Sequence, residues 1–185
     1  MQISPAKGEQ SPLAKLFRGK NLTGNPRIVR DLVASLHNNI QEWNIIHLHG
    51  LDILKNITSI KKDGEYSNQL DILCNDLEDD CIKLHEIVKN LEHLSYQLRT
   101  AVLLKKEPKN LFLTWPIEKY GHVAEIIYNA YKNEVAVKYS ILENVAHDHR
   151  ESAKMLHLAM WVRQVEIPEN INLLLESMLL ETGFR

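Results

Sequence analysis

Residues 70–101 read LDILCNDLEDDCIKLHEIVKNLEHLSYQLRTA, and this stretch decides the fold. Its apolar residues recur at alternating steps of three and four, and nine of the ten positions reached in this way are apolar. A repeat of about 3.5 residues is typical of the seam of a coiled coil, whereas a strand alternates every two residues. The stretch therefore predicts one long helix with a continuous apolar side. The seam consists of Leu70, Leu73, Leu77, Asp80, Leu84, Ile87, Leu91, Leu94, Leu98 and Ala101.

The preceding stretch carries a similar seam, and residues 62–65 (KDGE) between the two give a turn signal. No proline interrupts residues 27–107, so we expect a long antiparallel helical hairpin over this range. A two-helix hairpin seldom buries seams this wide alone, so the pattern calls for a third helix or a partner chain. The first seam consists of Val29, Leu32, Leu36, Asn39, Trp43, Ile46, Gly50, Ile53, Ile57 and Ile60.

The C-terminal region, residues 108–185, predicts three more helices. A break between Pro108 and Pro116 precedes a third long helix that extends to about residue 146. A shorter helix to about residue 164 and a last helix over residues 170–182 follow, with Gly183 as the C-cap. The expected fold is all-α: a long antiparallel coiled-coil helical hairpin followed by a third long helix and two shorter C-terminal helices.

Composition excludes several classes of protein. The chain has 185 residues, a net charge of −2 and 44% hydrophobic residues, which fits one globular domain without the basic excess of a nucleic-acid binder. Two cysteines cannot form a disulfide framework, and neither a secretory signal nor a membrane helix is expected. Residues 1–26 are basic and rich in proline and glycine, and predict a disordered tail.

The sequence offers little catalytic chemistry. It contains neither a G-x-x-x-x-G-K-[ST] phosphate loop nor a G-x-G-x-x-G fingerprint. Cys81 and His85, four residues apart on a helix, would supply only two metal ligands, and two ligands do not make a zinc site. No nucleophile has an obvious base. We therefore expect a non-enzymatic protein without cofactor or metal.

The tail contains two candidate phosphorylation sites. Residues 4–7 (SPAK) have the S-P-x-K form that proline-directed cell-cycle kinases prefer, and Ser11 precedes Pro12 in a poorer match. A phosphate on Ser4 or Ser11 would add negative charge to a basic segment and could change its choice of partner. Chance is the alternative explanation, because Ser-Pro pairs are common in tails of this composition.

Large apolar side chains are the candidates for partner contacts, since aromatic and aliphatic anchors dominate interfaces. Ordinary core packing is the alternative for the tryptophans, and the last helix could dock either onto the third helix or onto a partner. The seams also allow a homodimeric coiled coil that needs no outside partner. The interface candidates are Trp43, Leu84, Leu91, Trp115, Pro116, Trp161, Met178, Leu179 and Leu180.

Four segments resemble one known family. Residues 111–116 (LFLTWP), 160–161 (MW) and 175–183 (LESMLLETG) are similar to segments of the cyclin-dependent kinase 2-interacting protein family, and residues 36–43 (LHNNIQEW) share His37, Asn38 and Trp43 with it. The nine-residue match at 175–183 is the most specific of the four. The resemblance spans about residues 28–185.

The resemblance implies a nuclear, non-catalytic adaptor, with the cytoplasm as a second location. It implies links to replication-origin kinases and checkpoint signalling. It also implies a chromatin-associated complex built on a pair of AAA ATPases of the spermatogenesis-associated type, in which the protein pairs with a second small helical subunit. That complex would act on clients in DNA replication and in maturation of the large ribosomal subunit.

Overall fold

A computed structural model describes residues 22–60, 68–101, 111–147 and 150–184 of the chain. The phosphorylation candidates Ser4 and Ser11, most of the predicted tail and the turn at residues 62–65 lie outside these ranges. Within them the structure is all-α, as predicted, and none of its helices is long and apolar enough to span a membrane. The helices are α2 (Asn25–Ile60), α3 (Asn68–Thr100), α4 (Ile117–Val145), α5 (Glu151–Arg163) and α6 (Asn170–Glu181).

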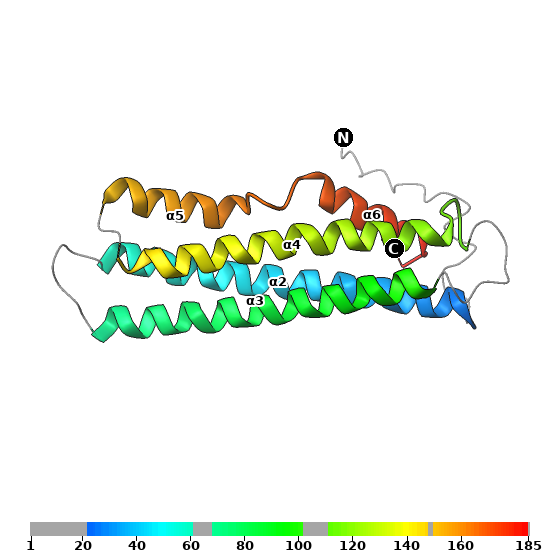
Figure 1. The fold of residues 1–185 in the computed structure, drawn as a ribbon, viewed down its shortest axis with the longest axis horizontal. Coiled ribbons are helices and arrows are strands. Elements are labelled where there is room, and N and C mark those ends of the chain that lie inside the picture. Colours follow the sequence, from blue (N-terminus) through cyan, green and yellow to red (C-terminus); the bar gives the residue numbers. More distant parts are fainter. Residues whose placement is uncertain (1–21, 61–67, 102–110, 148–149, 185) are drawn as a thin grey trace, which may run out of the picture.

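Helices α2 and α3 form the predicted antiparallel hairpin and lie side by side along their lengths (Figure 1). The seam predicted for α3 is buried apart from Leu73, which is partly exposed. In α2 the buried side drifts away from the predicted seam, because a straight helix repeats every 3.6 residues and α2 contacts three other helices besides α3. The buried residues that the α2 pattern did not include are Val33, Ile40, His47 and Leu54.

Helix α4 covers the hairpin and makes it a three-helix bundle (Figure 1). It packs along α3 and also contacts α2. Buried α4 side chains such as Ile127 and Tyr131 join one core cluster, while Ile141 and Val145 join a second cluster farther along the bundle. The third helix that the wide seams called for is therefore supplied by the chain itself.

Helices α5 and α6 form an interrupted fourth layer that contacts α2 and α4. Figure 1 shows them one after the other along α4. The interruption begins at Gln164, whose φ of 45° is left-handed, and contains Pro168, which has no N–H to continue a helix. Helix α6 ends at Glu181 with Thr182 as its C-cap, one residue before the predicted Gly183. Gly183 follows with a φ of 68°, a left-handed conformation that glycine adopts easily just after a helix.

Gly50 allows α5 to approach α2 closely. A Cβ atom added at Gly50 would lie 2.5 Å from Cζ2 of Trp161, and the indole is fully buried. A rigid ring in a packed core has no room to move by the ångström that a methyl group requires. The seam position that looked empty in the sequence is therefore filled by Trp161.

We expect the Gly50→Ala substitution to destabilise the protein by about 1–3 kcal/mol, because the added methyl group overpacks the contact with Trp161. At an exposed site the same change would stabilise a helix by about 1 kcal/mol, so the sign of the effect is diagnostic. Urea unfolding followed by circular dichroism measures it. Asn38→Ala, at an exposed position of the same helix, is the control and should change little. A variant as stable as the parent would contradict the close contact.

Candidate functional site

Most of the predicted interface residues lie inside the chain's own core. Pro116 is exposed and the Leu180 side chain is 53% exposed, so these two are accessible to a partner in the closed bundle. For these two a partner contact stays a prediction, whereas the others could contact a partner only if the bundle opened. The buried candidates are Trp43, Leu84, Leu91, Trp115, Trp161, Met178 and Leu179.

Two of the tryptophans join α5 to α2. Trp161 Nε1 donates a hydrogen bond of 3.0 Å to the backbone oxygen of His47, and the two rings stack with an interplanar angle of 10°. Trp43 Nε1 donates to Oε1 of Gln164 at 2.7 Å, and its ring meets Tyr131 of α4 edge-on. Each buried indole N–H thus finds an acceptor, as a buried tryptophan requires.

A buried ion pair joins the end of α5 to α4. Lys138 Nζ lies 2.8 Å from Oε1 of Glu134, and both side chains are fully buried. The same ammonium donates to the backbone oxygen of Trp161 at 2.8 Å and lies 4.4 Å from the centre of its ring. Oε2 of Glu134 accepts from the backbone N–H of Glu166 at 3.0 Å. The pair therefore satisfies backbone groups where α5 ends, which otherwise lack helical partners.

Burial controls the protonation of the groups around this pair. It lowers the pKa of Lys138, an effect that the Glu134 carboxylate opposes. Burial and then the Lys138 charge lower the pKa of His47 to about 4, so this imidazole is neutral at pH 7. Burial raises the pKa of the Cys81 thiol to about 12, with a further contribution from Asp80. Cys81 is therefore protonated at pH 7 and is a poor nucleophile.

Sequence reasoning missed Glu134 and Lys138, although a signal was present. Both occupy core positions of the helical repeat that also places Tyr131, Ile141 and Val145 on the inner side of α4. Opposite charges four residues apart at buried positions indicate an internal ion pair, because a lone buried charge is very unfavourable.

A second set of buried polar contacts connects the segment before α4 to the end of α6. Glu181 of α6 accepts hydrogen bonds from the backbone N–H groups of Thr114 and Trp115, at 2.9 and 3.1 Å, and from the Thr114 hydroxyl. The segments 111–116 and 175–183, which carried the family resemblance, therefore contact each other just before α4 begins. Burial, and to a lesser extent the Glu181 charge, raises the pKa of the nearby Tyr120 hydroxyl.

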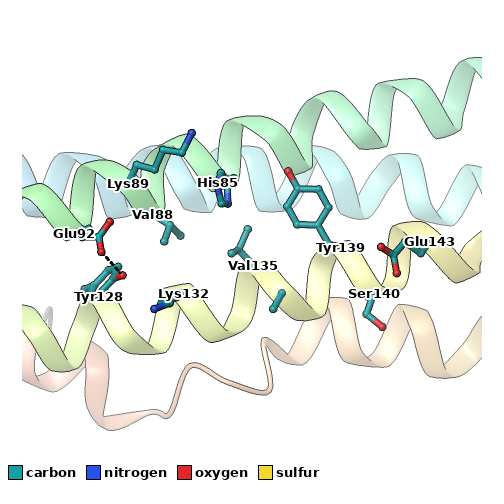
Figure 2. A pocket seen from close by; sticks show the side chains of 11 residues that line it. His85, Val88, Lys89, Glu92, Tyr128, Lys132, Val135, Tyr139, Ser140 and Glu143 are labelled. Carbon is teal, nitrogen blue, oxygen red and sulfur yellow. Dashed lines mark hydrogen bonds between the residues drawn. The ribbon is translucent and has the colours of Figure 1, made fainter.

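The outer side of α3 and α4 is hollowed into an open groove with a volume of about 690 Å³. Figure 2 shows side chains from both helices around it, with the Tyr128 hydroxyl donating to Glu92 at 2.8 Å. In the described ranges, no group of three or more His, Cys, Asp or Glu side chains could hold a metal ion. This groove and the outer side of α6 are the candidate interaction surfaces. The groove is lined by His85, Val88, Lys89, Glu92, Tyr128, Lys132, Val135, Ala136, Tyr139, Ser140 and Glu143.

Removing one member of the buried ion pair should be costly. We expect Lys138→Met to destabilise the protein by about 3–5 kcal/mol, because it leaves the Glu134 carboxylate buried and unpaired. The double variant Glu134→Gln/Lys138→Met should recover most of that loss, since both charges are gone and the glutamine oxygen can still accept from Glu166. Lys132→Met, at an exposed position of the same helix, is the control for urea unfolding. A single variant as stable as the parent would refute a structural role for the pair.

The buried imidazole predicts a loss of stability in mild acid. Between pH 6.5 and about 4 the unfolded chain binds a proton at His47 that the folded chain does not, so stability falls as pH falls through this window. We expect this group to contribute a loss of about 3 kcal/mol. Comparing unfolding free energies of the parent and His47→Leu at several pH values isolates that contribution. His93→Gln, at an exposed site on α3, should follow the parent, and an unchanged profile in His47→Leu would contradict the assignment.

Comparison with known proteins agrees with the resemblance. No family model matches the chain. Cyclin-dependent kinase 2-interacting proteins of Bos taurus and Homo sapiens are 29% and 28% identical to it, and that of Xenopus laevis is 26% identical. Each match spans 89% of this chain and 92% of the relative. The predicted resemblance to the cyclin-dependent kinase 2-interacting protein family is therefore confirmed along nearly the whole chain.

Proposed function

We propose that this protein is a non-catalytic interaction protein that binds a cyclin-dependent kinase. The observation that carries the proposal is the similarity, over 89% of the chain, to proteins named for such an interaction. The fold is suited to this role, because a helical bundle fixed by a buried ion pair and buried hydrogen bonds presents its outer side chains on a rigid scaffold.

The chemistry of the buried polar groups supports a role without catalysis. Cys81 is a buried, protonated thiol, and Lys138 is fully buried and held by Glu134 and the Trp161 carbonyl. Neither group is accessible to a substrate. Cys81 belongs to the second core cluster, and Lys138 holds the end of α5.

The kinase link can be tested with the full-length protein. A purified kinase–cyclin complex should bind the chain and phosphorylate it at Ser4, since residues 4–7 supply both the proline and the lysine that such kinases select. Ser4→Ala should remove most of the incorporated phosphate, whereas Ser11→Ala should remove less because no lysine lies three residues after it. Mass spectrometry locates the phosphate and biolayer interferometry measures the binding. Absence of binding would refute the kinase proposal, and binding without phosphate at Ser4 would refute only the assigned site.

The proposal extends to the assembly that the resemblance implies. In it the protein is a nuclear adaptor that pairs with a second small helical subunit and connects clients to an AAA ATPase in DNA replication and in large ribosomal subunit maturation. The outer side of α6 supports this extension. Leu173 and Leu180 lie seven residues apart, on one side of the helix, and are 68% and 53% exposed, while Met178 and Leu179 are buried against the bundle.

A paired substitution tests the outer side of α6. Leu173→Glu/Leu180→Glu places two charges on exposed positions, so the fold should be retained while an apolar contact is lost. We expect the AAA ATPase recovered with the tagged protein from nuclear extract to fall about tenfold, as when interface anchors are removed. Ile72→Glu, at a position 60% exposed on α3, is the matched control. A parent protein that recovers no AAA ATPase would refute the adaptor proposal, whereas undiminished recovery by the variant would refute only the α6 contact.

A further inference from the structure

Helix α5 buries fewer side chains than any other helix of the bundle. Three of its 13 residues are buried, namely Ala153, His157 and Trp161, whereas α6 buries five of its 12. Of these three only Trp161 is both large and apolar. Burial of apolar side chains supplies most of the free energy that holds a helix on its neighbours, so α5 is held less strongly than α6.

The outer side of α5 is also apolar. Met155, Leu156 and Val162 are 72%, 55% and 52% exposed. A surface helix usually turns its apolar residues toward the core, so that docking removes most of its apolar surface from water. In α5 a large part of that surface remains in water whether the helix is docked or not. Docking therefore gains little free energy for a helix with this many apolar residues.

The buried polar contacts of α5 gather near its C-terminal end. Trp161 Nε1 donates to the backbone of His47, and Lys138 donates to the backbone of Trp161. When α5 leaves the bundle, water can replace each of these partners, and the Glu134–Lys138 pair regains the hydration that burial removed. These contacts therefore determine where α5 docks more than how strongly it docks.

The helices on either side of α5 in the chain are anchored independently of it. Helix α4 packs along α3 and contributes to both core clusters. Helix α6 buries four apolar side chains, and its Glu181 accepts from the backbone N–H groups of Thr114 and Trp115. A non-helical connection between Arg163 and Asn170 separates α5 from α6 (Figure 1). Release of α5 therefore requires neither neighbour to move.

We propose that α5 is a detachable strap, a segment that leaves α2 and α4 as one unit while the three-helix bundle and α6 stay folded. An isolated helix of 13 residues is marginal in water, so the released strap also loses its helical hydrogen bonds. Release frees the Trp161 indole and uncovers the side of α2 at Gly50, against which this ring packs. The protein thus has a second state with an apolar surface that the closed bundle hides. This inference does not rest on kinase or ATPase binding.

Native-state hydrogen exchange on the full-length chain tests the strap. Amide protons of α5 should exchange together and at least tenfold faster than those at the centre of α3, because release is more frequent than global unfolding. Low concentrations of urea should accelerate exchange less in α5 than in α3, since release exposes less surface than unfolding does. Exchange in α5 at the same rate and with the same urea dependence as in α3 would overturn the proposal.

A core substitution outside the strap separates release from unfolding. Ile127→Val, in the core cluster that α5 does not join, should accelerate exchange at the centre of α3 by about two- to tenfold. It should leave α5 unchanged, because the closed and released states both keep that part of the core and are destabilised equally. Equal acceleration in α5 and α3 would overturn the proposal, since α5 would then exchange only through global unfolding.

A substitution within the strap gives the complementary result. Ala153→Glu should accelerate exchange in α5 at least tenfold, because a carboxylate at this buried position is hydrated only after release. Ser152→Glu, at the exposed neighbouring position of the same helix, is the matched control and should exchange like the parent. Circular dichroism checks that the bundle of each variant is folded. An Ala153→Glu variant whose α5 exchanges no faster than that of the parent would also overturn the strap.

Discussion

The fold depends on covering the apolar sides of α2 and α3 along their whole length. Two long helices in contact still leave a wide apolar strip, and exposing that strip to water would be unfavourable. Helix α4 lies along this strip and contributes to both core clusters. Once α4 is in place, its own outer surface and that of α2 form the support on which α5 and α6 pack.

Two sets of buried polar contacts fix the positions of α5 and α6 on α2 and α4. The Glu134–Lys138 pair satisfies backbone groups at the end of α5, and Glu181 satisfies backbone N–H groups just before α4. Apolar contacts alone would allow short helices to slide, whereas buried hydrogen bonds are satisfied in only one register. The fourth layer can therefore be interrupted near Pro168 and still occupy a defined place.

The segments that carry the family resemblance mainly supply residues to these contacts between helices. The backbone N–H of Trp115 donates to Glu181, and Trp43 and Trp161 lie where α2 contacts the end of α5. In this chain these residues therefore hold the bundle together. The surfaces available to partners are the groove between α3 and α4 and the outer side of α6, where the exposed Leu180 belongs to segment 175–183.

The sequence by itself determined the helices and their order, because the repeat of three and four, the prolines and Gly183 act locally. It also determined the buried side of α3 almost completely, since α3 keeps one seam along its length. Only the tertiary structure decided that Trp161 fills the space at Gly50, that the Glu134–Lys138 pair bonds the backbone groups at the end of α5, and that Ala136 borders a hollow. These features depend on which helix covers which side of another, and that choice is made by contacts between residues far apart in the chain.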